Sequence, residues 1–339
     1  MAKARSVETE ILYNGAEVGL SYKLETLSYT DNASGTSDEI VLTFEERSAA
    51  WIRDVLKPEK GADLDVTLYF NSWKADGDRL RYHCGNFTLD DLTYSAPPRR
   101  CTLKGVSIPA NEGFKSTEVS KTWKDVTLRQ IAEEMKAKYG MSDLYFWGTT
   151  PDPIFTVEQD KEPDSTFLTK VCEQQGMFLK IYKKALVIFD KSIYEAGEIT
   201  RTFYESDFEE GYTWNDTLSG TYTGAKLTYT SMSGSRSKKK AETIAVTVGD
   251  GPRWLELDSK VESEADAIRI CKAKVNEENE KAVTITFSVL SDPNIVATCN
   301  IALSGMGAMD GKYFVTKVMH RISGKHTMKV SAYKIFNRL

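Results

Sequence analysis

A thiol beside an imidazole is the pairing that a cysteine nucleophile needs, and His83-Cys84 is the only adjacent pair of these residue types in the sequence. The surrounding residues alternate between apolar and polar, which predicts a strand, and neighbouring side chains of a strand point to opposite faces. His83 and Cys84 therefore cannot activate each other. The other two histidines, His320 and His326, are predicted to be ordinary residues of a sheet.

Two loops have a composition that resembles ligand-binding motifs. The segment Ser304–Gly311 is similar to a dinucleotide fingerprint, but Asp310 stands at the third glycine position and a predicted strand follows where a helix is required. The segment Asp31–Asp38 has the composition of a calcium loop, but Ala33 and Gly35 replace the ligands at its third and fifth positions. We predict that both segments are structural turns.

Acidic pairs are the last candidates for catalysis. Glu45-Glu46 and Glu133-Glu134 are adjacent in sequence, whereas a glycosidase holds its two carboxylates at a defined separation across the substrate. These pairs are typical of solvated faces. The sequence therefore predicts no catalytic residue, no metal site and no cofactor, and so a protein that is not an enzyme.

A basic segment, SMSGSRSKKK, lies between two predicted strands near the start of the last third of the chain. It is polar apart from Met232, which predicts a mobile loop. It could contact nucleic acid or an acidic partner. Because it contains no aromatic residues, we favour a solvated loop that becomes ordered on assembly. The candidate partner-binding residues are Ser231, Arg236, Lys238, Lys239 and Lys240.

Composition limits the class of protein. The 339 residues are 41% hydrophobic and 27% charged, as in a soluble globular protein of two or three domains. A net charge of −5 argues against stable nucleic-acid binding through phosphate neutralisation. Five scattered cysteines without a CxxC pair predict free thiols. The amino-terminal residues lack the apolar core of a signal peptide, and no apolar run is long enough to insert into a membrane, so we expect synthesis in the bacterial cytoplasm.

The first third of the chain is predicted to be β-rich. Within Tyr29–Asn71, a polar turn is followed by an alternating strand at Ile40–Phe44, a short helix at Ser48–Leu56 and a second alternating strand at Leu64–Phe70. This unit of strand, covering helix and strand is a building block for a sheet or barrel. We assign residues 1–111 to a first β-barrel domain.

The period of the apolar residues changes in the middle of the chain. A capping box at Thr127–Gln130 begins a predicted helix that ends at Gly140. A second helix is predicted to start at Asp164 or Ser165 and to end at Gly176. With the strands around them, these helices predict a small α+β domain over residues 112–205.

The last third returns to β character over residues 206–339. A helix is predicted to begin at Ser263, with Ile268, Cys271 and Val275 on its apolar face, and an amphipathic strand follows at Val283–Val289. The order of strand, covering helix and strand repeats that of the first domain. The predicted fold class is thus mainly β: two barrel or sandwich domains, each with a covering helix, flank the α+β domain. Three copies of such a chain would present six similar units, which would let a three-fold object dock onto a six-fold one.

The chain resembles the late control D proteins of phages, which are the central baseplate hubs of contractile tails. These hubs are related to the amino-terminal half of type VI secretion spikes. Four stretches, together with Trp51, Pro58 and Gly61, carry the resemblance. They are YTDNASGTSDEIVLTF, VTLRQIAEEMKAKYGM, EPDSTFLTKVCEQQGM and NIVATCNIALSGMGAMDGKYFVTKVMHRISGKHTMKVSAYKI. These stretches are characteristic of a fold, and the resemblance assigns no active-site residue to this chain.

The resemblance implies a homotrimeric structural hub whose two barrels mimic the tail-tube fold. Its implied partners are the tail-tube protein, a spike protein and other baseplate proteins, and its implied location is the tail baseplate of a virion or related particle. Two alternatives stay open: a peptidoglycan-binding or cell-wall-degrading tail protein, and a tail-tube subunit. The sequence does not distinguish a phage from a bacteriocin or a secretion device.

Overall fold

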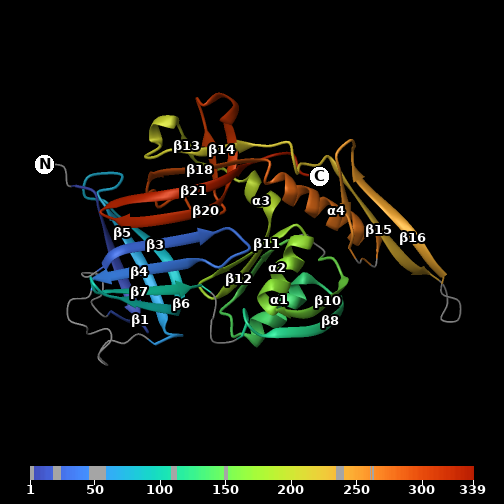
Figure 1. Ribbon diagram of the computed structural model, residues 1–339, viewed down its shortest axis with the longest axis horizontal. Helices are drawn as coiled ribbons and strands as arrows, with labels where there is room; N and C mark the ends of the chain where they lie inside the picture. The colour runs from blue at the N-terminus through green and yellow to red at the C-terminus, as the bar shows by residue number, and fades with distance from the viewer. Residues whose placement is uncertain are drawn as a thin grey trace.

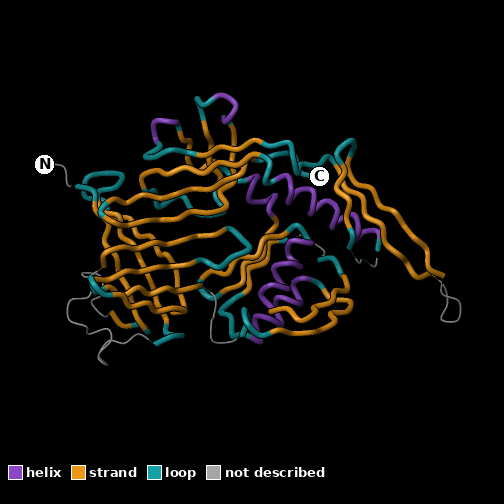
Figure 2. Tube along the Cα trace, viewed as in Figure 1, coloured by secondary structure: helices purple, strands orange, loops and turns teal. Residues whose placement is uncertain are grey.

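The computed structural model describes residues 4–17, 24–45, 59–107, 113–148, 152–233, 240–259, 261 and 263–339. The predicted helix at Ser48–Leu56 lies outside the described residues. The described chain is mainly β with an α+β segment in its middle, which confirms the predicted fold class at this level (Figure 2).

The first third forms seven strands, and the predicted alternation of buried and exposed side chains is confirmed. Ile40, Leu42 and Phe44 are completely buried. The turn at Asn14-Gly15 joins β1 to β2, and both of its residues have positive φ, as a two-residue hairpin turn of type I′ requires. The strands are β1 (Ser6–Tyr13), β2 (Ala16–Glu17), β3 (Leu24–Asn32), β4 (Glu39–Glu45), β5 (Asp63–Asn71), β6 (Arg79–Ser95) and β7 (Arg100–Val106).

Strands from the two ends of the chain share one sheet of 13 strands (Figure 1). Its main order is β14-β18-β21-β20-β3-β4-β7-β6-β5-β1-β2, and the junction is the antiparallel pair β20·β3, with Lys317 opposite Asn32 and Ile322 opposite Leu27. The boundaries 1–111, 112–205 and 206–339 stay a prediction. The other strands of this sheet come later in the chain: β13 (Ile199–Phe203), β14 (Thr213–Asp216), β18 (Val283–Leu290), β19 (Asn300–Leu303), β20 (Gly311–Ser323) and β21 (Lys325–Lys334).

The middle of the chain packs two helices against short strands, with a core of its own. The capping box is present: Gln130 N–H donates to Thr127 Oγ1 at 3.2 Å, and Thr127 N–H donates to Gln130 Oε1 at 2.9 Å. Gly140 and Gly176 have positive φ just after the two helices, as predicted. The elements are β8 (Glu118–Val126), α1 (Leu128–Lys138), β9 (Leu144–Trp147), β10 (Phe155–Pro163), α2 (Asp164–Gln174), β11 (Met177–Tyr182), β12 (Ala185–Asp190) and α3 (Lys191–Ala196).

A smaller sheet projects from the end of the molecule that lies opposite β1–β7 of the main sheet (Figure 1). It consists of β15 (Gly224–Ser233), β16 (Lys240–Gly249) and β17 (Trp254–Leu257), and α4 (Glu264–Asn279) packs on it. The predicted start of α4 is confirmed, because Ser263 Oγ accepts from Asp266 N–H at 3.1 Å. Cys271 and Val275 of the predicted apolar face are completely buried against the small sheet, but Ile268 is 36% exposed and Ala267 is buried in its place.

Candidate functional site: the joint and cleft beside the middle segment

A buried lysine joins the middle segment to the main sheet. Lys180 of β11 reaches into the β3–β4 hairpin, where its Nζ donates to Asp31 and to the carbonyl of Asn32 at 2.8 Å and lies 3.2 Å from Asp38 Oδ2. The second carboxylate oxygen of Asp31 accepts from Ala297 N–H at 2.8 Å. One carboxylate therefore ties three distant parts of the chain together. We call Asp31, Asp38 and Lys180 the ionic joint.

The electrostatics of the ionic joint follow from its burial. The side chains of Asp31 and Asp38 are 6% and 2% exposed, and that of Lys180 is 13% exposed. Burial raises the pKa of Asp38, although the Lys180 ammonium opposes this. Burial alone would lower the pKa of Lys180, but the two carboxylates outweigh it and raise that pKa. The arrangement can hold two segments in register.

A second buried network holds the last described residues against two helices. Glu195 of α3 accepts from Arg338 Nε at 2.6 Å, from Arg338 Nη2 at 2.5 Å and from the Tyr333 hydroxyl at 2.5 Å. Arg338 Nη2 also lies 2.9 Å from Glu280, just beyond α4, and Lys191 pairs with the same carboxylate at 3.1 Å. Burial opposes the charge of Arg338, but its hydrogen bonds to Glu195 raise its pKa further above the ordinary value. We call these residues the α3–α4 clamp.

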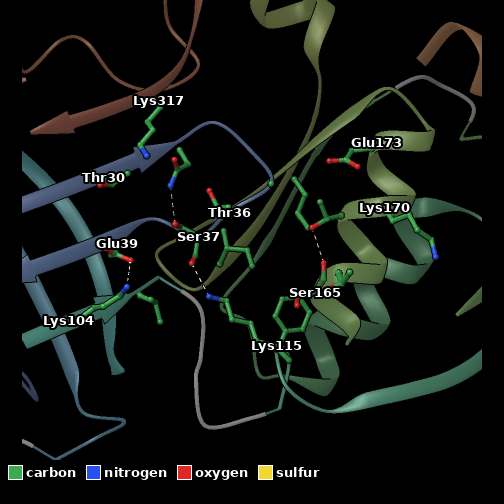
Figure 3. Close-up of a pocket in the computed structure, with 18 of the residues that line it drawn as sticks. Thr30, Thr36, Ser37, Glu39, Lys104, Lys115, Ser165, Lys170, Glu173 and Lys317 are labelled. Atoms are coloured by element: carbon green, nitrogen blue, oxygen red, sulfur yellow. Dashed lines mark hydrogen bonds and ion pairs between the residues drawn. The ribbon is translucent and has the colours of Figure 1, made fainter. Parts of the chain in front are cut away.

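Beside the ionic joint lies an open cleft of about 830 Å³ between the main sheet and α2 (Figure 3). Glu39 and Lys104 pair across its floor at 2.7 Å, and Lys115 Nζ donates to Ser37 Oγ at 3.0 Å. Its hydroxyl and charged side chains include Thr30, Thr36, Ser37, Glu39, Lys104, Lys115, Ser165, Thr166, Thr169, Lys170, Glu173 and Lys317. These groups suit the binding of another chain better than catalysis, because they do not converge on one point.

The candidate residues for chemistry are dispersed over the fold, and the Asp31–Asp38 segment borders the cleft through Thr36 and Ser37. His83 pairs with Asp65 at 2.9 Å on one face of β6, and Cys84 is buried on the other, as the strand pattern predicts. Ser304–Gly311 is a turn in which the Asp310 carboxylate accepts backbone N–H groups. The Asp31–Asp38 segment is a turn as predicted, and the cation that its carboxylates hold is Lys180.

The remaining candidates of the sequence also stay separate. Glu133 and Glu134 are exposed on α1, where Glu134 pairs with Lys121. Glu45 is exposed at the end of β4, and Glu46 lies outside the described residues. Within the described ranges, no group of three histidine, cysteine or acidic side chains is placed to hold a metal ion.

The basic segment 231–240 is only partly described. Arg236, Lys238 and Lys239 lie outside the described residues, so their role stays a prediction. Ser231 belongs to β15 and Lys240 to β16, opposite Ser233. The loop is therefore shorter at both ends than predicted, because the antiparallel pairing of β15 with β16 extends into the polar residues.

All five cysteines are free thiols, as predicted: Cys84, Cys101, Cys172 and Cys271 are buried, and Cys299 is half-buried. None of the helices in the described part of the chain has the length and apolar character needed to cross a membrane.

His320 is completely buried, and neither of its ring nitrogens has a hydrogen-bond partner among the described residues. It stacks on Tyr29 with 6.1 Å between ring centroids and lies 5.0 Å from the ring of Tyr82. Burial lowers its pKa from 6.5 to about 4, although the carboxylate of Asp292 acts in the opposite direction. The folded protein therefore holds this imidazole in its neutral form at neutral pH.

This burial predicts a loss of stability in acid. Between pH 6.5 and about 4 the unfolded chain binds a proton at His320 that the folded chain does not, so this contribution is complete above pH 6.5 and falls as the pH falls. By pH 5 the parent should lose about 2 kcal/mol that the His320→Phe variant keeps. Urea unfolding of both proteins at pH 7.5 and pH 5 measures the difference. Asp38 makes an opposite contribution, because its raised pKa favours folding in acid, but it does so in both proteins and cancels in the comparison. Equal pH dependence of the two unfolding free energies would contradict the prediction.

The comparisons with known proteins agree with this architecture. No protein-family model matches the chain. The probable baseplate hub protein of Escherichia phage 186 is 22% identical over 172 residues, which are 51% of this chain and 41% of that protein. The match therefore spans less than half of the hub protein's length.

Solved structures match over nearly the whole chain. The 43 kDa tail protein of prophage MuSo2 from Shewanella oneidensis has a TM-score of 0.70 at 13% identity, covering 97% of this chain and 98% of that one. A tail protein from Neisseria meningitidis MC58 has a TM-score of 0.69 at 11% identity, covering 97% of both chains. An Escherichia coli component of the type VI secretion system has a TM-score of 0.54 at 12% identity, covering 99% of this chain and 78% of that one.

The fold is therefore that of phage tail proteins. Together with the sequence match to a baseplate hub protein, this fold confirms the resemblance to the baseplate hub family that the sequence predicts.

Proposed function

We propose that the protein is the structural hub of the baseplate of a contractile tail or a related injection particle, where it adapts the six-fold tail tube to the three-fold spike. The observation that supports this most is the likeness to the MuSo2 tail protein, which extends over 97% of this chain. In this proposal residues 1–111 and 206–339 are the two tube-like domains, and residues 112–205 form the α+β domain beside them.

The shared sheet supports a mechanical role. β20 pairs with β3, so strands from both proposed tube-like domains form a single hydrogen-bonded sheet. Force along such a sheet is distributed over many backbone hydrogen bonds. A homotrimer would then present six similar units to the tube and three-fold symmetry to the spike.

The proposed partners are further copies of this chain, the tail-tube protein, the spike protein and other baseplate proteins, and the proposed location is the tail baseplate. In this role the protein is not an enzyme. The relatives that match are tail, hub and secretion-system proteins, which favours this role over a peptidoglycan-binding or cell-wall-degrading one.

The subunit count tests the proposal. Light scattering on the purified protein should give three times the chain mass of 38.1 kDa, or, after addition of spike protein, a complex that contains three copies of the chain. A protein that stays monomeric at every concentration and joins neither tube nor spike protein would sink the proposal. A hexameric ring would instead indicate a tube subunit, and clearing of purified peptidoglycan would indicate the cell-wall alternative.

A further inference from the structure

The floor of the cleft is a flat surface built from four adjacent strands in the order β20-β3-β4-β7. Met319, Thr30, Glu39 and Val106 lie opposite one another in register and form one row across it. With strands about 4.8 Å apart, the row is about 14 Å long. This length accommodates four to five residues of an extended chain at about 3.3 Å each. The helix α2 forms a wall along one side (Figure 3).

The cleft is positive on a negative protein. Four lysines and two glutamates line it, a net charge of +2, whereas the whole chain carries −5. Two of the lysines already have carboxylate partners: Lys104 pairs with Glu39, and Lys170 pairs with Glu162. Lys115 and Lys317 have no carboxylate partner among the residues that the structure describes.

The two uncommitted lysines are placed to receive a carboxylate. Ser37 Oγ accepts from Lys115 Nζ and positions it at the edge of the cleft, while Lys317 projects over the floor beside Thr30 (Figure 3). Partial desolvation lowers the pKa of Lys115, so an arriving carboxylate would stabilise its charged form. Glu173, the glutamate of the wall, lies at the other end of α2 from Lys115 in Figure 3 and does not block this edge.

We propose that this cleft binds an extended acidic segment, four to five residues long, from another protein of the particle. The carboxylates would pair with Lys115 and Lys317, and the hydroxyls of the floor and wall would bind the backbone. Two uncommitted cations beside two glutamates are too few for a nucleic acid, whose binding depends on many phosphate contacts. The inference rests on the proposed hub function and names one of its docking sites.

A peptide-binding measurement tests it. The probe is a fluorescent hexaglutamate peptide with blocked ends, and hexaglutamine is its neutral control. Fluorescence anisotropy with the full chain should show salt-sensitive binding of hexaglutamate only. The double variant Lys115→Glu/Lys317→Glu should weaken binding by about tenfold or more, because each lysine makes a charge-assisted hydrogen bond. The control variant Lys60→Glu/Lys124→Glu makes the same charge change at exposed positions that do not line the cleft and should bind as the parent does.

The outcomes separate this inference from the hub proposal. Absent binding, or equal weakening in both double variants, would overturn the inference. If reversing the charge of Lys115 and Lys317 abolishes the trimer, the cleft is an interface between copies of this chain, and the inference fails while the hub function stands. If a strictly monomeric protein binds hexaglutamate through these lysines, the site stands and the hub function fails.

Discussion

Replacing Lys180 with methionine should lower the free energy of unfolding by about 3–5 kcal/mol, the typical cost of removing one partner from a buried ion pair. The ammonium of Lys180 compensates two carboxylates that are at most 6% exposed, and methionine keeps the bulk of the side chain without the charge. Both carboxylates are buried, so without Lys180 their charges would be poorly solvated. Urea unfolding at neutral pH measures the change.

Two further variants distinguish lost charge compensation from lost packing. In Asp31→Asn/Asp38→Asn/Lys180→Met, both amides can still accept the backbone N–H groups that the carboxylates bind, and no buried charge remains. Most of the stability should return, since neutral replacements of buried ion pairs are often tolerated. Lys183→Met makes the same substitution three residues away at an exposed position and should cost less than about 0.5 kcal/mol. A triple variant as unstable as the single one would show that the charges are not the cause.

The features that the sequence predicted correctly depend on neighbours along the chain. The burial of Ile40, Leu42 and Phe44 follows from alternation within one strand, and the helix start at Thr127 follows from two hydrogen bonds three residues apart. On α4, Cys271 was correctly predicted to be buried, but Ile268 was wrongly placed on the same face, because the smaller Ala267 is the residue that faces the sheet. Hydrophobicity alone does not determine which side of a short amphipathic helix meets its neighbour.

The ionic joint and the cleft could not be predicted in the same way. Asp31 and Asp38 were recognised as a pair with the composition of a cation loop, but the cation that they hold is 142 to 149 residues further along the chain. The floor of the cleft combines β20 with β3, which are far apart in sequence. A single sequence contains no information on such pairings, because each depends on how separate sheets meet.

Replacing Arg338 with methionine should lower the free energy of unfolding by about 3 kcal/mol, the lower end of the cost of breaking a buried ion pair. The carboxylate of Glu195, 6% exposed, would then keep only the Tyr333 hydroxyl as a hydrogen-bond donor among the side chains of the α3–α4 clamp. The cost should stay near the lower end because the Tyr333 hydroxyl continues to donate to Glu195. Thermal and urea unfolding measure the change, and hydrogen exchange should show faster exchange in α3.

The double variant Glu195→Gln/Arg338→Met separates the buried charge from the contact itself. Glutamine can still accept from the Tyr333 hydroxyl, so removing the unpaired charge should restore most of the lost stability. Arg321→Met, an exposed position on β20, provides the matched control and should change stability by less than about 0.5 kcal/mol. If Arg338→Met changed stability no more than Arg321→Met, water would already reach Glu195 in the folded protein, and the clamp would contribute little to holding the last residues on α3 and α4.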